Sequence, residues 1–198
     1  MICFCKDKME EIVINKNEYF KCNNCGYLMK KNILSDELQK KRYDSHICDA
    51  SYYEYMNKIY ASIKNYIYGS SILDYGCGKV HALSDILNSN GYHCSYYDLF
   101  YYPNLENKKY DSIILIEVFE HILEPYKLLN NLKEMLNKNG KIIVMTKPII
   151  QDINNWWYLR DTTHVSFVEA RTMKKLADML LMKLLYIEEL SLFVFSCI

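Results

Sequence analysis

The chain has 198 residues, which is enough for one ordinary domain and a small additional segment. Apolar residues make up 51% of it, so a sizeable core can be buried, and the formal net charge of zero argues against a broad basic surface for nucleic acid. No apolar run reaches the roughly 18 residues of a membrane-spanning helix, and the first residues lack the pattern of a signal peptide. We therefore expect a cytoplasmic protein without a membrane partner, and a nucleic acid is not favoured as its partner.

Four cysteines near the start of the chain form two close pairs. Cys3 and Cys5 precede a segment with strand-like residues, and Cys22 and Cys25 follow it. A tetrahedral zinc ion takes four thiolates from two turns that face each other. In a reducing compartment such spacing indicates metal rather than disulfides. The sequence predicts a zinc-ribbon-like segment over residues 1–32 with a structural Zn²⁺; four free buried cysteines or a redox pair are the alternatives.

Residues 33–69 follow as a helical linker or lid. Charged residues dominate positions 36–42 and predict an exposed helix. Apolar residues recur at helical spacing over residues 51–68, which predicts a second helix with one buried face.

A strand, a glycine turn and a helix are predicted over residues 70–89. An apolar run ends in Asp74, and the turn contains Gly76 and Gly78. Glycine lets a ligand approach the backbone closely, and the first helical turn presents unpaired N–H groups. The spacing lacks the third glycine of a dinucleotide-binding turn and is not a phosphate loop; an acid there would also repel a pyrophosphate. The turn therefore predicts a ligand with an ammonium group, such as S-adenosylmethionine.

Acidic residues also follow the next two predicted strands. Asp98 ends the strand at residues 92–97, and a carboxylate there can accept hydrogen bonds from both hydroxyls of an adenosine ribose. The apolar strand at residues 112–116 leads into Glu117. Because ligands bind at the carboxyl ends of parallel strands, we expect these acids to face one site.

Four stretches of the sequence are LDYGCG, YYD, YDSIILIEVFEHI and LNKNGKIIVMTKP. In their residues and their order they resemble the motifs of class I S-adenosylmethionine-dependent methyltransferases. The resemblance covers the chain from Ser70 onward and implies an α/β Rossmann-like sheet with a cofactor-binding core over residues 70–198. It implies that the cofactor is held by Asp74, Gly76, Gly78, Asp98 and, at its methionine end, Glu117. It also implies that the preceding segment covers the cofactor, so that Tyr43 and His46 line the pocket; an exposed helix end is the alternative.

The chain departs from this family after Asp98. Residues 99–109 are too few for a crossover helix and a further strand, so the third strand is expected to be missing or reduced to a loop. Leu99, Phe100 or Tyr101 would then contact the adenine, unless the contact comes from elsewhere. Beyond it we expect a helix at residues 126–136 closed by Asn139 and Gly140, and a final helix followed by two antiparallel strands.

The segment at residues 147–168 is expected at the acceptor side. It contains Trp156 and Trp157, which would form aromatic walls, followed by Asp161 and His164. A similar W-Y-x-x-D-x-T-H-V-x-F run occurs in one bacterial branch of these methyltransferases, whose members often carry an N-terminal cysteine cluster.

His164, oriented by Asp161, is the candidate general base of this segment, because an imidazole titrates near neutrality. Alternatively the segment is a loop-to-helix junction in which His164 only bonds the backbone. His121, from the E-H pair after Glu117, either orients the substrate or packs against the next helix.

The sequence therefore predicts a methyltransferase that uses S-adenosylmethionine and a structural Zn²⁺ and acts on an oxygen, nitrogen or carbon nucleophile of a small molecule. Two other functions stay open. One is a catalytically decayed protein that binds a cofactor or a partner through its ribbon. The other is an RNA methyltransferase that reads RNA with the ribbon, in which case RNA binding would depend strongly on salt.

Overall fold

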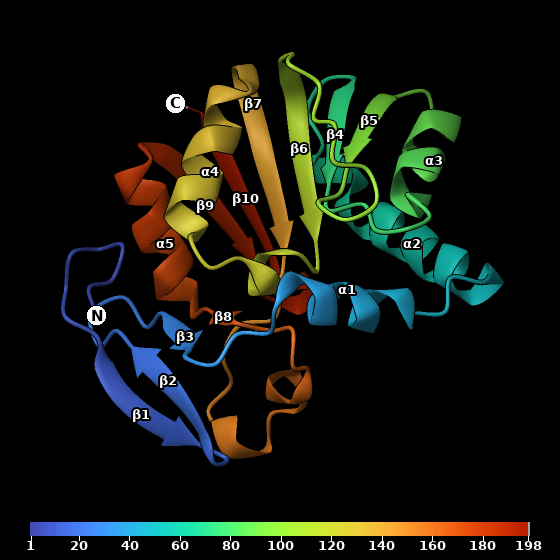
Figure 1. Ribbon diagram of the computed structural model, residues 1–198. Helices are drawn as coiled ribbons and strands as arrows, with labels where there is room; N and C mark the ends of the chain where they lie inside the picture. Colours follow the sequence, from blue (N-terminus) through green and yellow to red (C-terminus); the bar gives the residue numbers. More distant parts are fainter. Residues whose placement is uncertain (198) are drawn as a thin grey trace.

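The structure, a computed structural model, describes residues 1–197. Its largest element is a six-stranded sheet in the order β5-β4-β6-β7-β10-β9 (Figure 1). The strands are β4 (Ser71–Tyr75), β5 (His93–Tyr97), β6 (Tyr110–Ile116), β7 (Leu136–Met145), β9 (Met182–Ile187) and β10 (Leu192–Cys197). The first four run parallel, whereas β10 is antiparallel to both of its neighbours. The predicted Rossmann-like sheet with its closing antiparallel pair is confirmed.

The described chain has five α-helices, and local sequence signals mark the start of three of them. The five helices are α1 (Asp36–Asp44), α2 (Ala50–Ile63), α3 (Ala82–Ser89), α4 (Pro125–Glu134) and α5 (Ala170–Met179). Asp49 caps α2 by accepting a hydrogen bond from the backbone N–H of Ser51, and Pro125 opens α4, where its missing N–H costs nothing. Glu169 and Thr172 form a reciprocal capping box at the start of α5.

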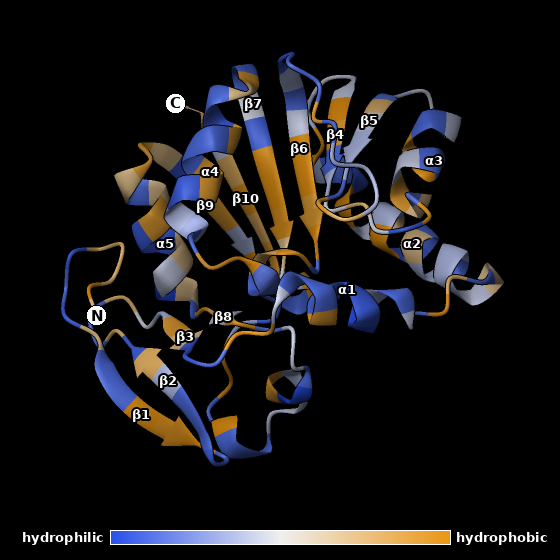
Figure 2. Ribbon diagram, viewed as in Figure 1, coloured by the Kyte–Doolittle hydropathy of each residue, from blue (hydrophilic) through white to orange (hydrophobic). Residues whose placement is uncertain are grey.

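Helices cover both faces of the sheet because successive residues of its strands point to opposite sides. In β6, Ile113 and Leu115 belong to the cluster formed with α4 and α5, whereas Ile114 and Ile116 belong to the cluster formed with α2 and α3. Figure 2 shows the apolar residues concentrated in these central strands, with polar residues on the outer sides of the helices. Strands buried on both faces read as continuous apolar runs, which is why β6 was recognisable in the sequence.

The shortened region after β5 is confirmed. Within the described chain, residues 99–109 contain no strand of the sheet, and a single antiparallel bridge joins Asp98 to Tyr102. Strand β5 is therefore an edge of the sheet. The family's third strand is replaced by a short loop that folds back on the end of β5.

One boundary prediction is wrong. Asn139 and Gly140 do not close the preceding helix, because α4 ends at Glu134 and both residues lie within β7. The pairing of β7 with β6 shifts register between Tyr110 and Ser112, so residues 137–140 bulge out of the ladder. Asn139 has a φ of 64°, and this left-handed conformation serves the bulge rather than a helix cap.

The cysteine-rich segment is part of a second sheet. Strands β1 (Glu10–Ile14), β2 (Asn17–Lys21) and β3 (Leu28–Lys30) form an antiparallel meander, and β8 (Ser166–Phe167) pairs with β3. Cys22 and Cys25 pack in the same core cluster as α5 and the main sheet. The segment at residues 1–32 is thus built into the body of the protein, beside the acceptor-side segment (Figure 1).

Helix α1 crosses the carboxyl ends of the central strands (Figure 1). None of its residues is buried, which agrees with the charged pattern of the sequence. Among residues 1–197, no helix combines the length and the apolar character that crossing a bilayer requires.

The contact between the cysteine segment and α5 gives a stability prediction. The fully buried hydroxyl of Thr172 donates to Cys25 O at 2.7 Å and accepts from Glu169 N at 2.9 Å. Thr172→Val keeps the shape of the side chain but leaves both backbone groups without this partner, so we expect a loss of roughly 2 kcal/mol in the free energy of unfolding. Urea unfolding measures it. Thr162→Val, at an exposed position, is the control, and equal destabilisation of the two variants would contradict the prediction.

Candidate functional site

The glycine turn after β4 is tied to the end of β5. Gly76 N and Cys77 N donate to Tyr97 O at 2.7 and 3.0 Å, and Gly78 N donates to the Asp98 carboxylate at 3.1 Å. Gly76 and Gly78 have φ values of 81° and 70°. A Cβ on Gly76 would lie 2.4 Å from Val118, so glycine is required there by space as well as by conformation. Around Gly78 a Cβ would meet no atom within 4 Å, so the turn faces open space where a ligand can approach.

Asp98 is oriented by the backbone. Besides the bond from Gly78, its other oxygen accepts from Phe100 N at 2.9 Å and from Tyr101 N at 3.2 Å. A carboxylate has about four lone-pair positions, so these bonds fix its direction and leave acceptor capacity for a ligand. The short loop that replaces the family's third strand thus holds this acid in place.

Asp74 lies beneath the glycine turn and is 3% exposed. It accepts a hydrogen bond from Ser84 Oγ at 2.8 Å and lines a narrow cavity together with Tyr52 and Met56 of α2. Burial raises the pKa of Asp74 to about 6, although the bond from Ser84 opposes this shift. A buried carboxylate beside a binding turn favours a cationic partner.

Helix α1 contacts residues on both the cofactor side and the acceptor side of the edge where the parallel strands end. Tyr43 OH lies 3.0 Å from His121 Nδ1, and Tyr101 OH donates to Asp44 at 2.8 Å. Arg42 forms an ion pair with Asp161 at 2.9 Å. Tyr43 therefore lies against the expected acceptor residues, and α1 contacts both the loop after β5 and the acceptor segment.

The acceptor segment brings His164 to His121, with ring centroids 4.9 Å apart. His164 is 7% exposed, and its Nδ1 lies 2.8 Å from Tyr158 O. Burial and the nearby His121 lower the pKa of His164 to about 4. Asp161 does not bond this ring within the described residues; it accepts from the N–H and hydroxyl of Thr163 and pairs with Arg42. The Tyr158 carbonyl therefore orients the His164 ring. No hydrogen bond of the described residues joins the Asp161 carboxylate to this ring, although the sequence predicts that Asp161 orients it.

Two further acids meet below these rings. Glu117 follows β6 with a φ of 51°, a strained conformation for a residue with a side chain, and accepts from Tyr158 OH at 3.1 Å. Burial and the neighbouring Glu120 raise the pKa of Glu117 to about 7. Glu120 is fully buried and accepts from Thr146 Oγ1 at 3.0 Å.

Sequence reasoning missed part of this cluster and misplaced one aromatic residue. Glu120 was noted in its E-H pair but given no role, and Tyr158 was not singled out although it lies inside the aromatic run. Trp156 is 4% exposed and packs on Tyr158 and Phe167 in a core cluster, so it forms no open wall. Trp157 is 58% exposed and alone of the two tryptophans faces solvent.

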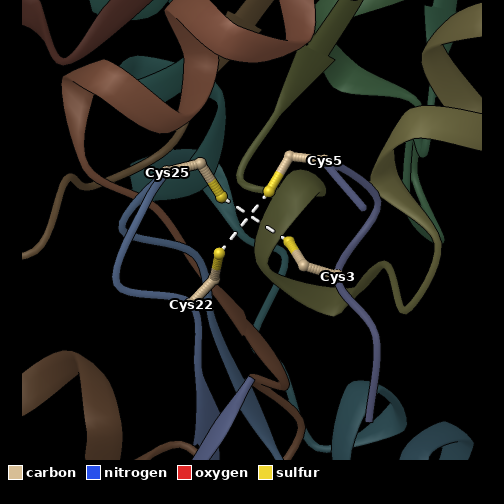
Figure 3. Close-up of side chains that lie close together, drawn as sticks. All are labelled: Cys3, Cys5, Cys22 and Cys25. Carbon is tan, nitrogen blue, oxygen red and sulfur yellow. Dashed lines mark hydrogen bonds between the residues drawn. The ribbon is translucent and has the colours of Figure 1, made fainter. Parts of the chain in front are cut away.

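The four predicted cysteine ligands converge on one point (Figure 3). Cys3 Sγ lies 3.6 Å from Cys25 Sγ, Cys5 Sγ lies 3.5 Å from Cys22 Sγ, and all four sulfurs are within 4.8 Å of one another. A tetrahedron with zinc–sulfur bonds of about 2.3 Å has edges of about 3.8 Å. The donor set and its spacing therefore fit a zinc ion with four thiolate ligands.

The buried acid Asp74 gives a pH-dependent prediction. Because its folded pKa exceeds the unfolded value of 3.8, this group destabilises the fold increasingly from about pH 4 to pH 6, and by a constant amount above. We expect Asp74→Asn to unfold at a higher temperature than the wild type at pH 7.5, with a gain of about 1–3 kcal/mol that shrinks as the pH falls to 5. Thermal melts at both pH values measure it, with Asp178→Asn on α5 as the control. A gain that grows in acid would contradict the sign.

The comparisons with known proteins agree with this geometry. The sequence profile of a family described as a methyltransferase domain matches residues 46–179, and no curated protein matches the chain. The magnesium protoporphyrin IX methyltransferase from Synechocystis PCC 6803 with bound S-adenosylmethionine is similar in structure, with a TM-score of 0.54, 11% identity, and coverage of 83% of this chain and 92% of that chain. A methyltransferase from Archaeoglobus fulgidus that depends on the same cofactor has a TM-score of 0.52 and 15% identity, covering 81% and 98% of the two chains. At these identities the two likenesses show the fold, and the profile shows the family. The chain belongs to the methyltransferase-domain family and has the class I S-adenosylmethionine-dependent methyltransferase fold.

Proposed function

We propose that this protein transfers the methyl group of S-adenosylmethionine to an oxygen, nitrogen or carbon nucleophile of a small molecule. The main support for the proposal is that the glycine turn and Asp98 lie in contact at one edge of the sheet, where Gly78 faces open space. Family membership alone would also fit a protein that has lost this site. The retained and backbone-oriented acid favours the enzyme.

Each cofactor-side residue has a distinct task in this proposal. The free acceptor positions of Asp98 bind the ribose hydroxyls, and the turn at Gly76 and Gly78 lets the ligand lie against the backbone. Asp74 and Glu117 supply negative charge toward the ammonium at the methionine end. When bound, S-adenosylmethionine supplies an electrophilic methyl group on a positively charged sulfur. Phe100, in the loop after β5, packs against Tyr43 with ring centroids 5.6 Å apart, and we assign this pair to the adenine side.

The acceptor binds beside His164 and His121. His164 is a general base in this proposal, because its Nδ1 is held by the Tyr158 carbonyl and its lowered pKa keeps the ring neutral near pH 7. A positioned base contributes about 10²–10⁴-fold when the nucleophile must lose a proton. Trp157 offers an exposed aromatic surface next to Tyr158 for a small molecule. Asp161 and Arg42 hold the segment against α1 and act through position rather than by contact with the acceptor.

The zinc ion in this proposal is structural. Four thiolates complete its coordination and leave no open position. Its effect reaches the acceptor side through β3 and β8, since Lys30 N donates to Val165 O and Leu28 pairs with Phe167. Four reduced thiols also favour the reducing cytoplasm as the location.

Titration calorimetry with S-adenosylmethionine and S-adenosylhomocysteine tests the cofactor site. We expect micromolar binding by the wild type and at least about tenfold weaker binding by Asp98→Ala, because the ribose hydroxyls lose charge-assisted hydrogen bonds. Asp178→Asn, an exposed acid on α5, is the matched control and should bind as the wild type does. A folded, zinc-loaded wild type that binds neither compound would reject the enzyme and favour the partner-binding alternative.

Removal of the zinc tests its structural role. We expect one zinc per chain by elemental analysis, lost in Cys22→Ser and retained in Cys48→Ser, which lies outside the cluster. In Cys22→Ser, amide hydrogen exchange should rise over residues 163–168 more than over β4, because β8 depends on β3 for its pairing. Unchanged exchange in residues 163–168 of the zinc-free protein would show that the ribbon does not support the acceptor side.

A further inference from the structure

Three acceptor atoms converge beneath the acceptor segment. Glu120 Oε1 is buried and has no hydrogen-bond partner among the described residues. His121 Nε2 and His164 Nε2 each lie 4.0 Å from it, and the three atoms are within 4.8 Å of one another. They come from two separate parts of the chain, the loop after β6 and the segment before β8. A buried carboxylate oxygen without a partner is costly and calls for an explanation.

Hydrogen bonds on the far side of each ring indicate which nitrogens carry hydrogen. His164 Nδ1 lies 2.8 Å from Tyr158 O, and His121 Nδ1 lies 3.0 Å from Thr163 O. A carbonyl oxygen can only accept, so His164 Nδ1 carries the hydrogen and donates it. His121 Nδ1 has a second neighbour, Tyr43 OH at 3.0 Å, whose hydroxyl oxygen can also accept, so a hydrogen on this nitrogen suits both of its neighbours. In a neutral imidazole the Nε2 atom is then a bare acceptor. With both rings in this form and Glu120 ionised, its Oε1 faces two nitrogen lone pairs, and no donor hydrogen lies between the three atoms.

We propose that Glu120, His121 and His164 bind a divalent transition-metal ion at the acceptor side of the site. A cation supplies the positive charge that three converging acceptors lack. The backbone carbonyls behind both rings are the outer partners that metal-bound histidines require to fix their orientation. Thr146 does the same for the carboxylate by donating to its other oxygen at 3.0 Å.

The spacing suits such an ion after a small contraction. A triangle with two edges of 4.0 Å and a third of at most 4.8 Å has its centre at most about 2.5 Å from each corner. Metal bonds to imidazole nitrogen and carboxylate oxygen are about 2.0–2.2 Å long, so each atom need move inward by a few tenths of an ångström. Two imidazoles and one carboxylate favour ions such as Mn²⁺, Fe²⁺, Co²⁺ or Zn²⁺. This set differs in chemistry from the four thiolates of the cysteine cluster, so the two sites can be distinguished.

This inference rests on the proposed methyl transfer and adds to it, because such an ion specifies an oxygen atom as the methyl acceptor. Three protein ligands leave coordination positions open, and a bound hydroxyl loses its proton to water more readily than a free one. The resulting oxygen forms its bond to the methyl carbon while the carbon–sulfur bond breaks and the sulfur keeps the electron pair. His164 then acts as a ligand instead of a base, and the substrate class is an alcohol, phenol or hydroxy acid.

Manganese binding tests the site without any substrate. The zinc-loaded full chain is titrated with Mn²⁺, and free Mn²⁺ is followed by electron paramagnetic resonance; thiolates bind this ion poorly, so the cysteine cluster does not interfere. We expect one Mn²⁺ per chain, bound at least about tenfold more weakly by Glu120→Gln. Glu124→Gln, an exposed acid of the same loop, is the matched control and should bind as the wild type does. His121→Gln, at a partly exposed ligand, serves if the buried variant does not fold.

Cobalt then tests the open positions. Co²⁺ bound in place of Mn²⁺ should give visible absorption bands that shift when acetohydroxamate, a bidentate oxygen ligand, is added. Unshifted bands would overturn the oxygen-acceptor step. Failure of Mn²⁺, Co²⁺ and Zn²⁺ to bind beyond the cysteine-bound zinc, or equal binding by Glu120→Gln, would overturn the site itself. Binding of S-adenosylmethionine by the same samples reports separately on the cofactor site, so failure of the metal and failure of the methyltransferase are distinguishable.

Discussion

Parallel pairing of β5, β4, β6 and β7 is the constraint on which the rest of the structure depends, because strands that run together also end together. Each of them is followed by a turn, so the polar residues after the strands are delivered to a single edge. Asp98 and Glu117 are distant in sequence but share this edge. Backbone N–H groups of the glycine turn and of the loop after β5 then orient Asp98.

A second pairing joins the cysteine segment to that edge. Two residues of β8 pair with β3, and this short strand begins two residues after His164. Ser166 also contacts Tyr27 OH at 2.7 Å, so the joint is buried and polar as well as hydrogen-bonded through the backbone. A small sheet of this kind has little core of its own. Its strands therefore share a buried cluster with the acceptor segment, in which Tyr19 and Leu28 pack with Phe167.

Three buried ionisable groups lie at the edge where the parallel strands end. Asp74, Glu120 and His164 are each less than 10% exposed, and burial shifts the pKa of all three toward the neutral form. Such buried groups lower the stability of the free protein. They are typical of sites in which a bound ligand supplies the partner of opposite charge. In β6 and β7 the core clusters above the edge are built from alternating apolar residues such as Ile113, Ile114 and Val144, whose burial provides the stability that offsets this cost.

The sequence by itself determined the order and type of most elements, the loss of the third strand, the grouping of the four cysteines and the acids after the strands. These follow from local signals: hydrophobic period, turn glycines, residue spacing and loop length. It misplaced the end of α4, because Asn139 and Gly140 suit a helix cap and a strand bulge equally and pairing with β6 decided between them. The tertiary structure alone decided that β8 completes the ribbon sheet, that Tyr158 rather than Asp161 holds His164, and that Glu120 faces both imidazoles. Each of these contacts joins residues through the packing of separate elements, and no local pattern records which side chains will meet once those elements are packed.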